Sequence, residues 1–315
     1  MIPLYSQLDY WGIFHTIEFG NVSAFNPSLL TLPSRNAFVV VAREEYQFQW
    51  IDGIMVQPRH VVAGLLHVES DSERRWAPKE SPIIRSHSVE RLQLVHSNAT
   101  YFPHCDLETN AIQGPEDPRL IWSHLGEPLM IYNSVAKGAN LCRQFYLVDL
   151  RSVYVMDISE TKPPIRFNES IPISYGGQEG VHKNWAPFTN SAGDVFFHIH
   201  LIPQTIYKLS QGVLEWVIGH PPEDENCITI ALEGMPKQRV HQSTPFLDVV
   251  LCRSTDVRCD RDPNNHVYMG VIHAQHIISN TRYYETRVVT LNYSLPFNYI
   301  SISKPMLYCM ILHFC

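Results

Sequence analysis

The sequence predicts an all-β fold for two reasons. Its apolar segments are short, rich in β-branched and aromatic residues, and bounded by Pro, Gly, Asn or Asp, and no long stretch shows the helical apolar period of about 3.6 residues. In addition, 22 prolines are spread over the whole length, which suits many loops and opposes long helices. The expected strands are residues 37–44, 59–69, 128–136, 144–150, 194–202, 267–275 and 283–293.

The spacing of these strands predicts the architecture. Short hairpins form clusters that recur every ~45–65 residues, as expected for propeller blades of about four strands each. Five such blades fit into 315 residues. We therefore expect a five-bladed β-propeller whose inner strands surround a central funnel, although a sandwich or a pair of jelly rolls stays open on pattern alone. No low-complexity linker divides the chain, so we expect one domain over residues 1–315, best supported over residues 20–305.

Composition excludes several classes of protein. The content of 45% hydrophobic and 17% charged residues is typical of a globular protein with a real core. The net charge of −7 and the lack of a local Lys/Arg cluster argue against a nucleic-acid partner. No run of about 18 apolar residues is present, so no transmembrane helix is expected in the sequence as it stands.

Glycosylation sequons favour a secretory compartment, the ER or Golgi lumen, although a cytoplasmic location stays open. The first residues lack the basic start and apolar run of a signal peptide. We therefore expect a glycoprotein whose upstream membrane anchor is missing from this sequence, and the apolar last residues suggest a truncated C-terminal tail. The sequon asparagines are Asn21, Asn98, Asn168 and Asn292.

The seven cysteines do not indicate a zinc site, because no C-x-x-C spacing occurs among them. Cys252 and Cys259 could close a small disulfide loop in an oxidising compartment. Buried free thiols are an equally good interpretation of the cysteines.

The most unusual segment is residues 114–122, GPEDPRLIW, where three charged residues and two prolines precede an apolar strand. The residues that follow predict a hairpin, with Glu116, Asp117 and Arg119 at its entry. An Asp before a Pro is a common turn starter, so a purely structural turn is one interpretation. Alternatively, Asp117 projects into a cleft as a general acid, Arg119 orients a partner, and Glu116 supports them.

A second informative segment covers residues 180–209. Lys183, Asn184 and Trp185 combine a cation, an amide and a large aromatic face before a proline. Such groups suit a sugar or a phosphate, although Trp185 also fits a plain core position. His198 and His200 fall on one face of the expected strand, but no third metal ligand has a convincing spacing, so we expect no metal site.

Further polar residues lie near strand ends and are individually weak signals. Asn26 precedes a proline, Arg43 ends an apolar strand, and His241 precedes a short polar run. His273 lies on an apolar strand, and Tyr284 lies on its expected hairpin partner. Together these are the groups that a funnel would collect from distant parts of the chain.

Taken in order, these motifs resemble those of the five-bladed β-propeller carbohydrate enzymes. The segments are FNPSLL with VVVARE, GPEDPRLIW, KNWAPF, HIHLIPQTIYKL, and GVIH with RYYE, over roughly residues 20–305. Among these enzymes, the chain resembles the β-mannoside phosphorylases and the β-1,2-mannosyltransferases of fungi and protists. The E-D-P-R element is the most specific part of the resemblance, followed by K-N-W-x-P-F.

The resemblance implies a function and roles for individual residues. Asp117 would be the catalytic acid of an inverting enzyme that uses a single carboxylate and acts through a substrate hydroxyl. Partners would be a mannoside or other glycan acceptor and a phosphate or sugar-phosphate donor, with no metal and no other cofactor. The residues that would line the sugar or phosphate subsites are Asn26, Arg43, Glu116, Arg119, Lys183, Asn184 and Trp185, with His241, His273 and Tyr284 added by strand position.

Two other functions remain open from the sequence. An inverting glycoside hydrolase would need a second carboxylate roughly 6.5–9.5 Å from the acid to activate water. The candidates for that carboxylate are Glu69, Asp194 and Glu285. The third possibility is a non-catalytic propeller that binds glycans or proteins, with E-D-P-R as a structural turn.

Overall fold

The computed structural model shows an all-β chain, and each of the seven strands expected from the sequence is present in it. The structure describes residues 16–19, 21–32, 37–44, 48–51, 54–67, 83–95, 105, 112–135, 141–156, 163–173, 180–181, 183–217, 228–232, 240–251, 262–278 and 281–306.

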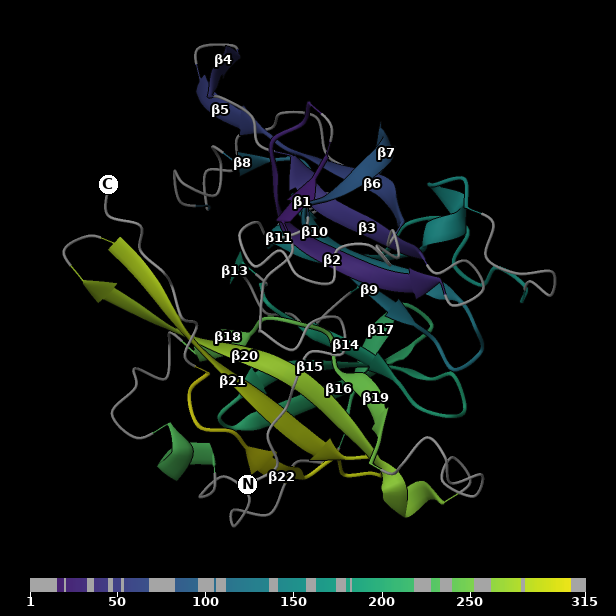
Figure 1. Ribbon diagram of the computed structural model, residues 1–315, viewed down its shortest axis with the longest axis vertical. Coiled ribbons are helices and arrows are strands. Elements are labelled where there is room, and N and C mark those ends of the chain that lie inside the picture. Colours follow the sequence, from purple (N-terminus) through teal and green to yellow (C-terminus); the bar gives the residue numbers. More distant parts are fainter. Residues whose placement is uncertain are drawn as a thin grey trace, which may run out of the picture.

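Four mainly antiparallel sheets of four or five strands follow one another along the chain, and we call them blades 1 to 4 (Figure 1). Blade 1 contains β2 (Ala24–Leu32), β3 (Ala37–Glu44), β6 (His60–His67), β7 (Ile83–Arg91) and β1 (Thr16–Glu18). Blade 2 contains β9 (Glu116–Trp122), β10 (Pro128–Val135), β11 (Leu141–Asp149), β12 (Ile171–Ile173) and β13 (Gly180–Val181).

The other two blades have the same layout. Blade 3 contains β14 (Ala186–Thr189), β15 (Val195–Leu201), β16 (Gln204–Ser210) and β17 (Val213–Trp216). Blade 4 contains β18 (Val240–Gln242), β19 (Leu247–Val250), β20 (His266–Ile278), β21 (Thr281–Asn292) and β22 (Tyr299–Ile302), and both β18 and β19 pair with β20. A separate small sheet joins β4 (Gln49–Ile51), β5 (Ile54–Pro58) and β8 (Ile112–Gln113).

The blades pack face to face as in a β-propeller. β9 lies against β2 and β14, and β18 lies against β15, so β2, β9, β14 and β18 are the central strands of the four blades. Neighbouring blades share hydrophobic cores, and successive residues of β9 enter different ones. Leu120 packs in the core between blades 1 and 2, whereas Ile121 packs in the core between blades 2 and 3. A third core joins blade 3 to blade 4 around Phe188, Phe246 and Tyr268.

The expected number of five blades is not confirmed, because the described residues form four. The central strands begin at residues 24, 116, 186 and 240. The first two intervals are therefore longer than the expected ~45–65 residues per blade. Part of the extra length of the first interval forms β4 and β5, which belong to no blade.

One disulfide is present among the described residues, between Cys105 and Cys142. No local pattern predicted this pair, because 37 residues separate the two cysteines. The bond links a connecting segment to β11 beside Arg143. The loop expected between Cys252 and Cys259 lies outside the described residues. Within the described part of the chain, no helix is long and apolar enough to cross a membrane.

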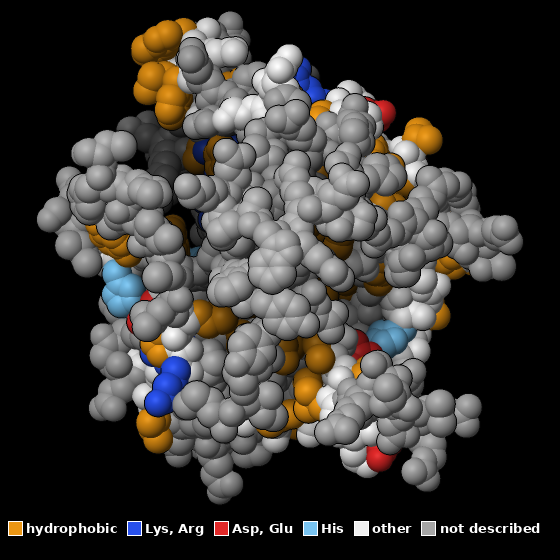
Figure 2. Space-filling model, viewed as in Figure 1, with side chains coloured by type: hydrophobic (Ala, Val, Ile, Leu, Met, Phe, Trp, Pro, Cys, Tyr) orange, Lys and Arg blue, Asp and Glu red, His pale blue; other side chains and the backbone are white. Residues whose placement is uncertain are grey.

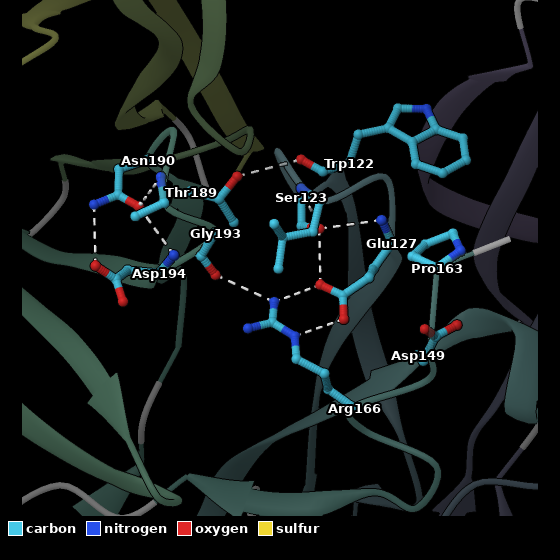
Figure 3. Close-up of polar contacts among 12 residues, drawn as sticks. Trp122, Ser123, Glu127, Asp149, Pro163, Arg166, Thr189, Asn190, Gly193 and Asp194 are labelled. Carbon is cyan, nitrogen blue, oxygen red and sulfur yellow. Dashed lines mark hydrogen bonds and ion pairs between the residues drawn. The ribbon is translucent and has the colours of Figure 1, made fainter. Parts of the chain in front are cut away.

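At one end of the propeller, a buried carboxylate ties blade 2 to blade 3 (Figure 3). Glu127 is 1% exposed and accepts hydrogen bonds from Ser123 Oγ at 2.8 Å and Arg166 Nε at 2.6 Å. Arg166 Nη2 also bonds Glu127 and donates to the Gly193 carbonyl at 3.2 Å, in the turn of blade 3. Because a buried carboxylate is costly without a partner, Arg166 should stabilise this contact between blades.

We expect Arg166→Ala to lower the free energy of unfolding by about 2–3 kcal/mol, somewhat less than for a fully buried pair because Arg166 is 38% exposed. Lys208→Ala is the matched control, since Lys208 pairs with Asp194 at 2.9 Å but both side chains are more than a third exposed. The control should lose at most about 1 kcal/mol. Urea unfolding measures both, and equal losses would contradict a special role for Arg166.

Candidate functional site

The central strands of the blades bring polar residues together at one end of the propeller. Asn26 lies near the start of β2, Glu116 starts β9, Lys183 lies just before β14, and His241 lies in β18. Central strands of a propeller run in the same direction, so their starts meet at one end. The contact between Glu127 and Arg166 lies beyond the far end of β9 and therefore marks the opposite end.

Glu116 is a buried carboxylate surrounded by four cations. Its side chain is 1% exposed. Its Oε2 lies 3.1 Å from Arg43 Nη1 and 3.0 Å from Arg59 Nη1, and its Oε1 lies 3.3 Å from Arg143 Nε and 3.7 Å from Lys183 Nζ. Arg43 comes from blade 1, Arg59 from the link between β5 and β6, Arg143 from blade 2, and Lys183 from the segment before blade 3. Glu116 therefore acts as a shared counter-ion that holds the site together.

Asp117 is the more accessible of the two neighbouring acids. Its side chain is 27% exposed, and its Oδ1 accepts hydrogen bonds from Asn26 Nδ2 at 2.8 Å and Arg43 Nη1 at 3.1 Å. Consecutive side chains of a regular strand point to opposite faces. Here both Glu116 and Asp117 contact Arg43, because the chain has a positive φ of 51° at Asp117 and the pairing of β9 with β10 shifts register there.

The same backbone conformation recurs once in each of three blades. Asn26 has a φ of 54°, Asp117 of 51° and Asn184 of 62°. Only five described residues other than glycine have a positive φ, and three of them lie at the starts of central strands. Asn and Asp tolerate this conformation better than other residues, yet it still costs about 1–3 kcal/mol at each position. Such strain concentrated at one end of the fold points to a functional site.

The cluster around Glu116 carries more positive than negative charge. Four cations face two carboxylates, and two buried guanidinium nitrogens, Arg43 Nε and Arg59 Nε, have no hydrogen-bond partner. Burial lowers the pKa of Arg59; Glu116 opposes this shift, and Arg43 adds to it. Mutually repelling guanidinium groups with unused N–H donors form a favourable site for an anion.

Arg119 is buried and connects three blades, so it does not face a substrate. It is 8% exposed, and its Nη1 donates to the Trp185 carbonyl at 2.8 Å while its Nη2 donates to the Gln242 carbonyl at 2.7 Å. Burial lowers its pKa to about 10, against the opposing effect of Asp117, so the group stays charged near neutral pH. Arg119 thus fixes the segments that follow Asn184 and His241 relative to β9.

Trp185 belongs to the hydrophobic core, which is the alternative that the sequence left open. The side chain is 1% exposed, and its ring centroid lies 4.5 Å from that of Phe145 and 6.0 Å from that of Phe197. Its indole face is therefore covered by core aromatics. A direct sugar contact of Trp185 stays a prediction, and this geometry does not favour it.

His241, His273 and Tyr284 come together in blade 4. The ring centroids of Tyr284 and His273 are 5.4 Å apart, and those of His241 and His273 are 6.1 Å apart. Burial lowers the pKa of His273, and Arg119 adds to the shift. Arg119 therefore interacts electrostatically with both Asp117 and His273.

His198 and His200 do not share a face, because the pairing of β15 with β16 shifts register between them. His198 is fully buried and bonds to Tyr299 Oη at 3.1 Å and Gln242 Nε2 at 2.6 Å, whereas His200 is exposed. Among the described residues, no group of three His, Cys, Asp or Glu side chains is arranged to hold a metal ion.

The three candidates for a second catalytic carboxylate lie in different places. Asp194 lies at the opposite end of the propeller and pairs with Lys208. Glu285 pairs with Arg287 at 2.7 Å. It lies opposite Ala274 and next to Thr286, which pairs with His273, so strand alternation places Glu285 on the other face of the hairpin from His273. Glu69 lies outside the described residues.

Two arginines of this cluster were not identified from the sequence. Arg59 follows a proline at the entry to an apolar strand. Arg143 is 1% exposed, bonds the Asn133 side chain, and donates to the carbonyls of Ile112 at 2.9 Å and Gly114 at 3.0 Å. The only signal in the sequence was that each is a lone cation beside apolar strand residues.

Comparisons with known proteins give structural likeness without sequence likeness. No family model and no curated protein sequence matches the chain. A putative glycosidase from Bacteroides thetaiotaomicron is similar with a TM-score of 0.42 and 12% identity, over 90% of this chain and 73% of that one. A structure from the GH130 family of mannoside phosphorylases is similar with a TM-score of 0.40 and 13% identity, over 93% of this chain and 73% of that one. A GDP-Man-dependent mannosyltransferase from Leishmania mexicana is similar with a TM-score of 0.37 and 10% identity, over 93% of this chain and 72% of that one.

We expect the stability of the protein to fall as the pH drops below about 6.5, partly because of His273. The folded-state pKa of His273 lies below its unfolded value, so the unfolded chain binds the proton first, and the stability that a neutral His273 supplies is lost on acidification. The variant His273→Gln should lose less unfolding free energy than the wild type when the pH falls from 7 to 5. Urea unfolding between pH 7 and pH 5 measures this, with His276→Gln, a half-buried histidine of the same strand, as control. Identical slopes for wild type and His273→Gln would contradict it.

Proposed function

We propose that this protein is a carbohydrate-active enzyme that transfers or phosphorolyses β-linked mannosyl residues, with Asp117 as its acid. The observation that carries the proposal is the pairing of one accessible carboxylate, Asp117, with a cluster of excess cations around Glu116. A sugar hydroxyl can bond Asp117 and Asn26 from the exposed side, while a phosphate group can bond the cations beside them.

The proposed chemistry needs only this one acid. In phosphorolysis a phosphate oxygen attacks the anomeric carbon, the glycosidic C–O bond breaks, and the leaving oxygen receives a proton that Asp117 supplies through a substrate hydroxyl. In transfer the same steps run in reverse: an acceptor hydroxyl attacks, the phosphate leaves, and Asp117 receives the proton. Arg43, Arg59 and Lys183 would neutralise the phosphate in both directions.

The proposed site favours phosphate over water as the second reactant. An inverting hydrolase needs a second carboxylate roughly 6.5–9.5 Å from the acid. Glu116 is already surrounded by four cations, and Asp194 lies at the far end of the propeller. Release of free mannose without phosphate would favour the hydrolase instead. A non-catalytic glycan-binding propeller would bind sugars without any turnover.

We also propose that the protein functions in the secretory pathway, in the ER or Golgi lumen. Asn21, Asn168 and Asn292 of the sequons are exposed, as glycan attachment requires, and Asn98 lies outside the described residues. The bond between Cys105 and Cys142 fits an oxidising compartment. Expression in secreting cells followed by glycosidase treatment and a mobility shift would test this.

We expect Asp117→Asn to lower turnover by about 10²–10⁴-fold, as the loss of a general acid does. The assay is phosphate-dependent release of mannose-1-phosphate from a mannoside, or its reverse. Asp194→Asn is the control, because that carboxylate lies at the opposite end and pairs with Lys208; it should keep full activity. Unchanged turnover in Asp117→Asn would remove Asp117 from the mechanism.

We expect Lys183→Met to weaken the binding of inorganic phosphate by about tenfold, which corresponds to about 1.4 kcal/mol. Lys183 is 43% exposed, so its loss should leave the fold intact. Lys208→Met, at the far end of the propeller, should bind phosphate like the wild type. Isothermal titration calorimetry measures all three proteins, and equal affinities would show that phosphate does not bind at the Glu116 cluster.

A further inference from the structure

A two-stranded hairpin projects from the propeller beside the proposed site. It consists of β4 and β5, and its only other strand partner among the described residues is the short β8 (Figure 1). The figure shows β4 and β5 at the top of the view, away from the four blades. An isolated two-stranded hairpin is marginally stable in water, so its position needs a physical reason.

One face of this hairpin is apolar and exposed. Trp50 is paired with Met55, so their side chains project from the same face, and Phe48 lies two residues before Trp50. Trp50 is 74% exposed, Phe48 54% and Met55 47%. Hydrophobic side chains are gathered at the top of the molecule in Figure 2, where Figure 1 places β4 and β5. Water therefore covers three large apolar side chains that a packed blade would bury.

The hairpin is firmly joined to the cations of the proposed site. β5 ends at Pro58, and the next residue is Arg59, whose backbone N–H donates to the Gln113 carbonyl at 2.7 Å. β8 leads directly to Gly114, where an added Cβ would lie 2.2 Å from the Arg59 carbonyl oxygen. Such a close approach permits only glycine. The end of β5 is therefore held in a fixed position beside the cluster around Glu116.

The area of the apolar face indicates which kind of partner it binds. Three partly exposed side chains offer roughly 400 Å², about half of the ~800 Å² that each partner buries in a stable protein interface. The net charge of −7 gives no attraction to an anionic membrane surface. The flat C–H face of a sugar ring matches an exposed indole in size and polarity, and its hydroxyls remain in water.

We propose that the face formed by Phe48, Trp50 and Met55 binds the distal part of the glycan acceptor, beyond the sugar that reacts at Asp117. This inference rests on the proposed function. Met55 lies four residues before Arg59, which is about 13 Å along an extended strand. An oligosaccharide can span that distance from the site, whereas a monosaccharide cannot. The hairpin thus selects long acceptors over short ones.

Calorimetric titration with mannohexaose and with mannose tests the proposal in Trp50→Ala, with Trp216→Ala as the matched control. Trp216 is a second exposed tryptophan, 65% accessible, on the outer strand of blade 3. We expect Trp50→Ala to bind mannohexaose about tenfold more weakly, as the loss of an aromatic contact worth ~1.4 kcal/mol predicts. Mannose should bind equally to all three proteins, and Trp216→Ala should match the wild type with both sugars.

The outcomes separate this inference from the proposed function. If Trp50→Ala binds mannohexaose like the wild type, the hairpin is not an acceptor site, and the proposed function stands. If the wild type binds neither sugar nor phosphate, both proposals are wrong. If Trp50→Ala changes only the sedimentation coefficient, the face is a contact with a second copy of the chain, which also overturns the inference.

Discussion

The buried carboxylate of Glu116 is the interaction on which the proposed site depends. It lies within 4 Å of Arg43, Arg59, Arg143 and Lys183, which come from four separate segments of the chain. Without it the four cations would repel one another in a region that excludes most water. Glu116 and Asp117 together cannot neutralise all four charges, so the cluster keeps an affinity for anions.

The E-D-P-R segment owes its unusual composition to three tasks within four residues. Glu116 points inward to the cations, and Arg119 bonds the backbone of blades 3 and 4. Asp117 lies between them with a positive φ, which turns its side chain to the same side as Glu116. Asn26 and Asn184 have the same conformation in blades 1 and 3. The strained residues thus mark one repeated position of the propeller, although the blades share no visible sequence repeat.

Strand positions and the E-D-P-R hairpin were predictable from local sequence, because alternation, β-branched residues and turn residues act over a few positions. That Asn26, Arg43 and Asp117 would line one site was expected from the funnel of a propeller and from the resemblance. Their hydrogen bonds could not be predicted, since 91 and 74 residues separate these partners. The roles of Arg59 and Arg143 could not be predicted, because burial and partners depend on how blades pack. His198 and His200 were expected on one face, but a register shift that no local pattern signals separates them.

A crystal structure of the protein with mannose and inorganic phosphate would show whether the cluster around Glu116 binds phosphate beside Asp117. We expect phosphate within about 3 Å of Arg43, Arg59 and Lys183, and a sugar hydroxyl bonded to Asp117. If both ligands bind only elsewhere, for example near Glu127 at the opposite end of the propeller, then the cluster around Glu116 is not the phosphate site and the proposed function is wrong.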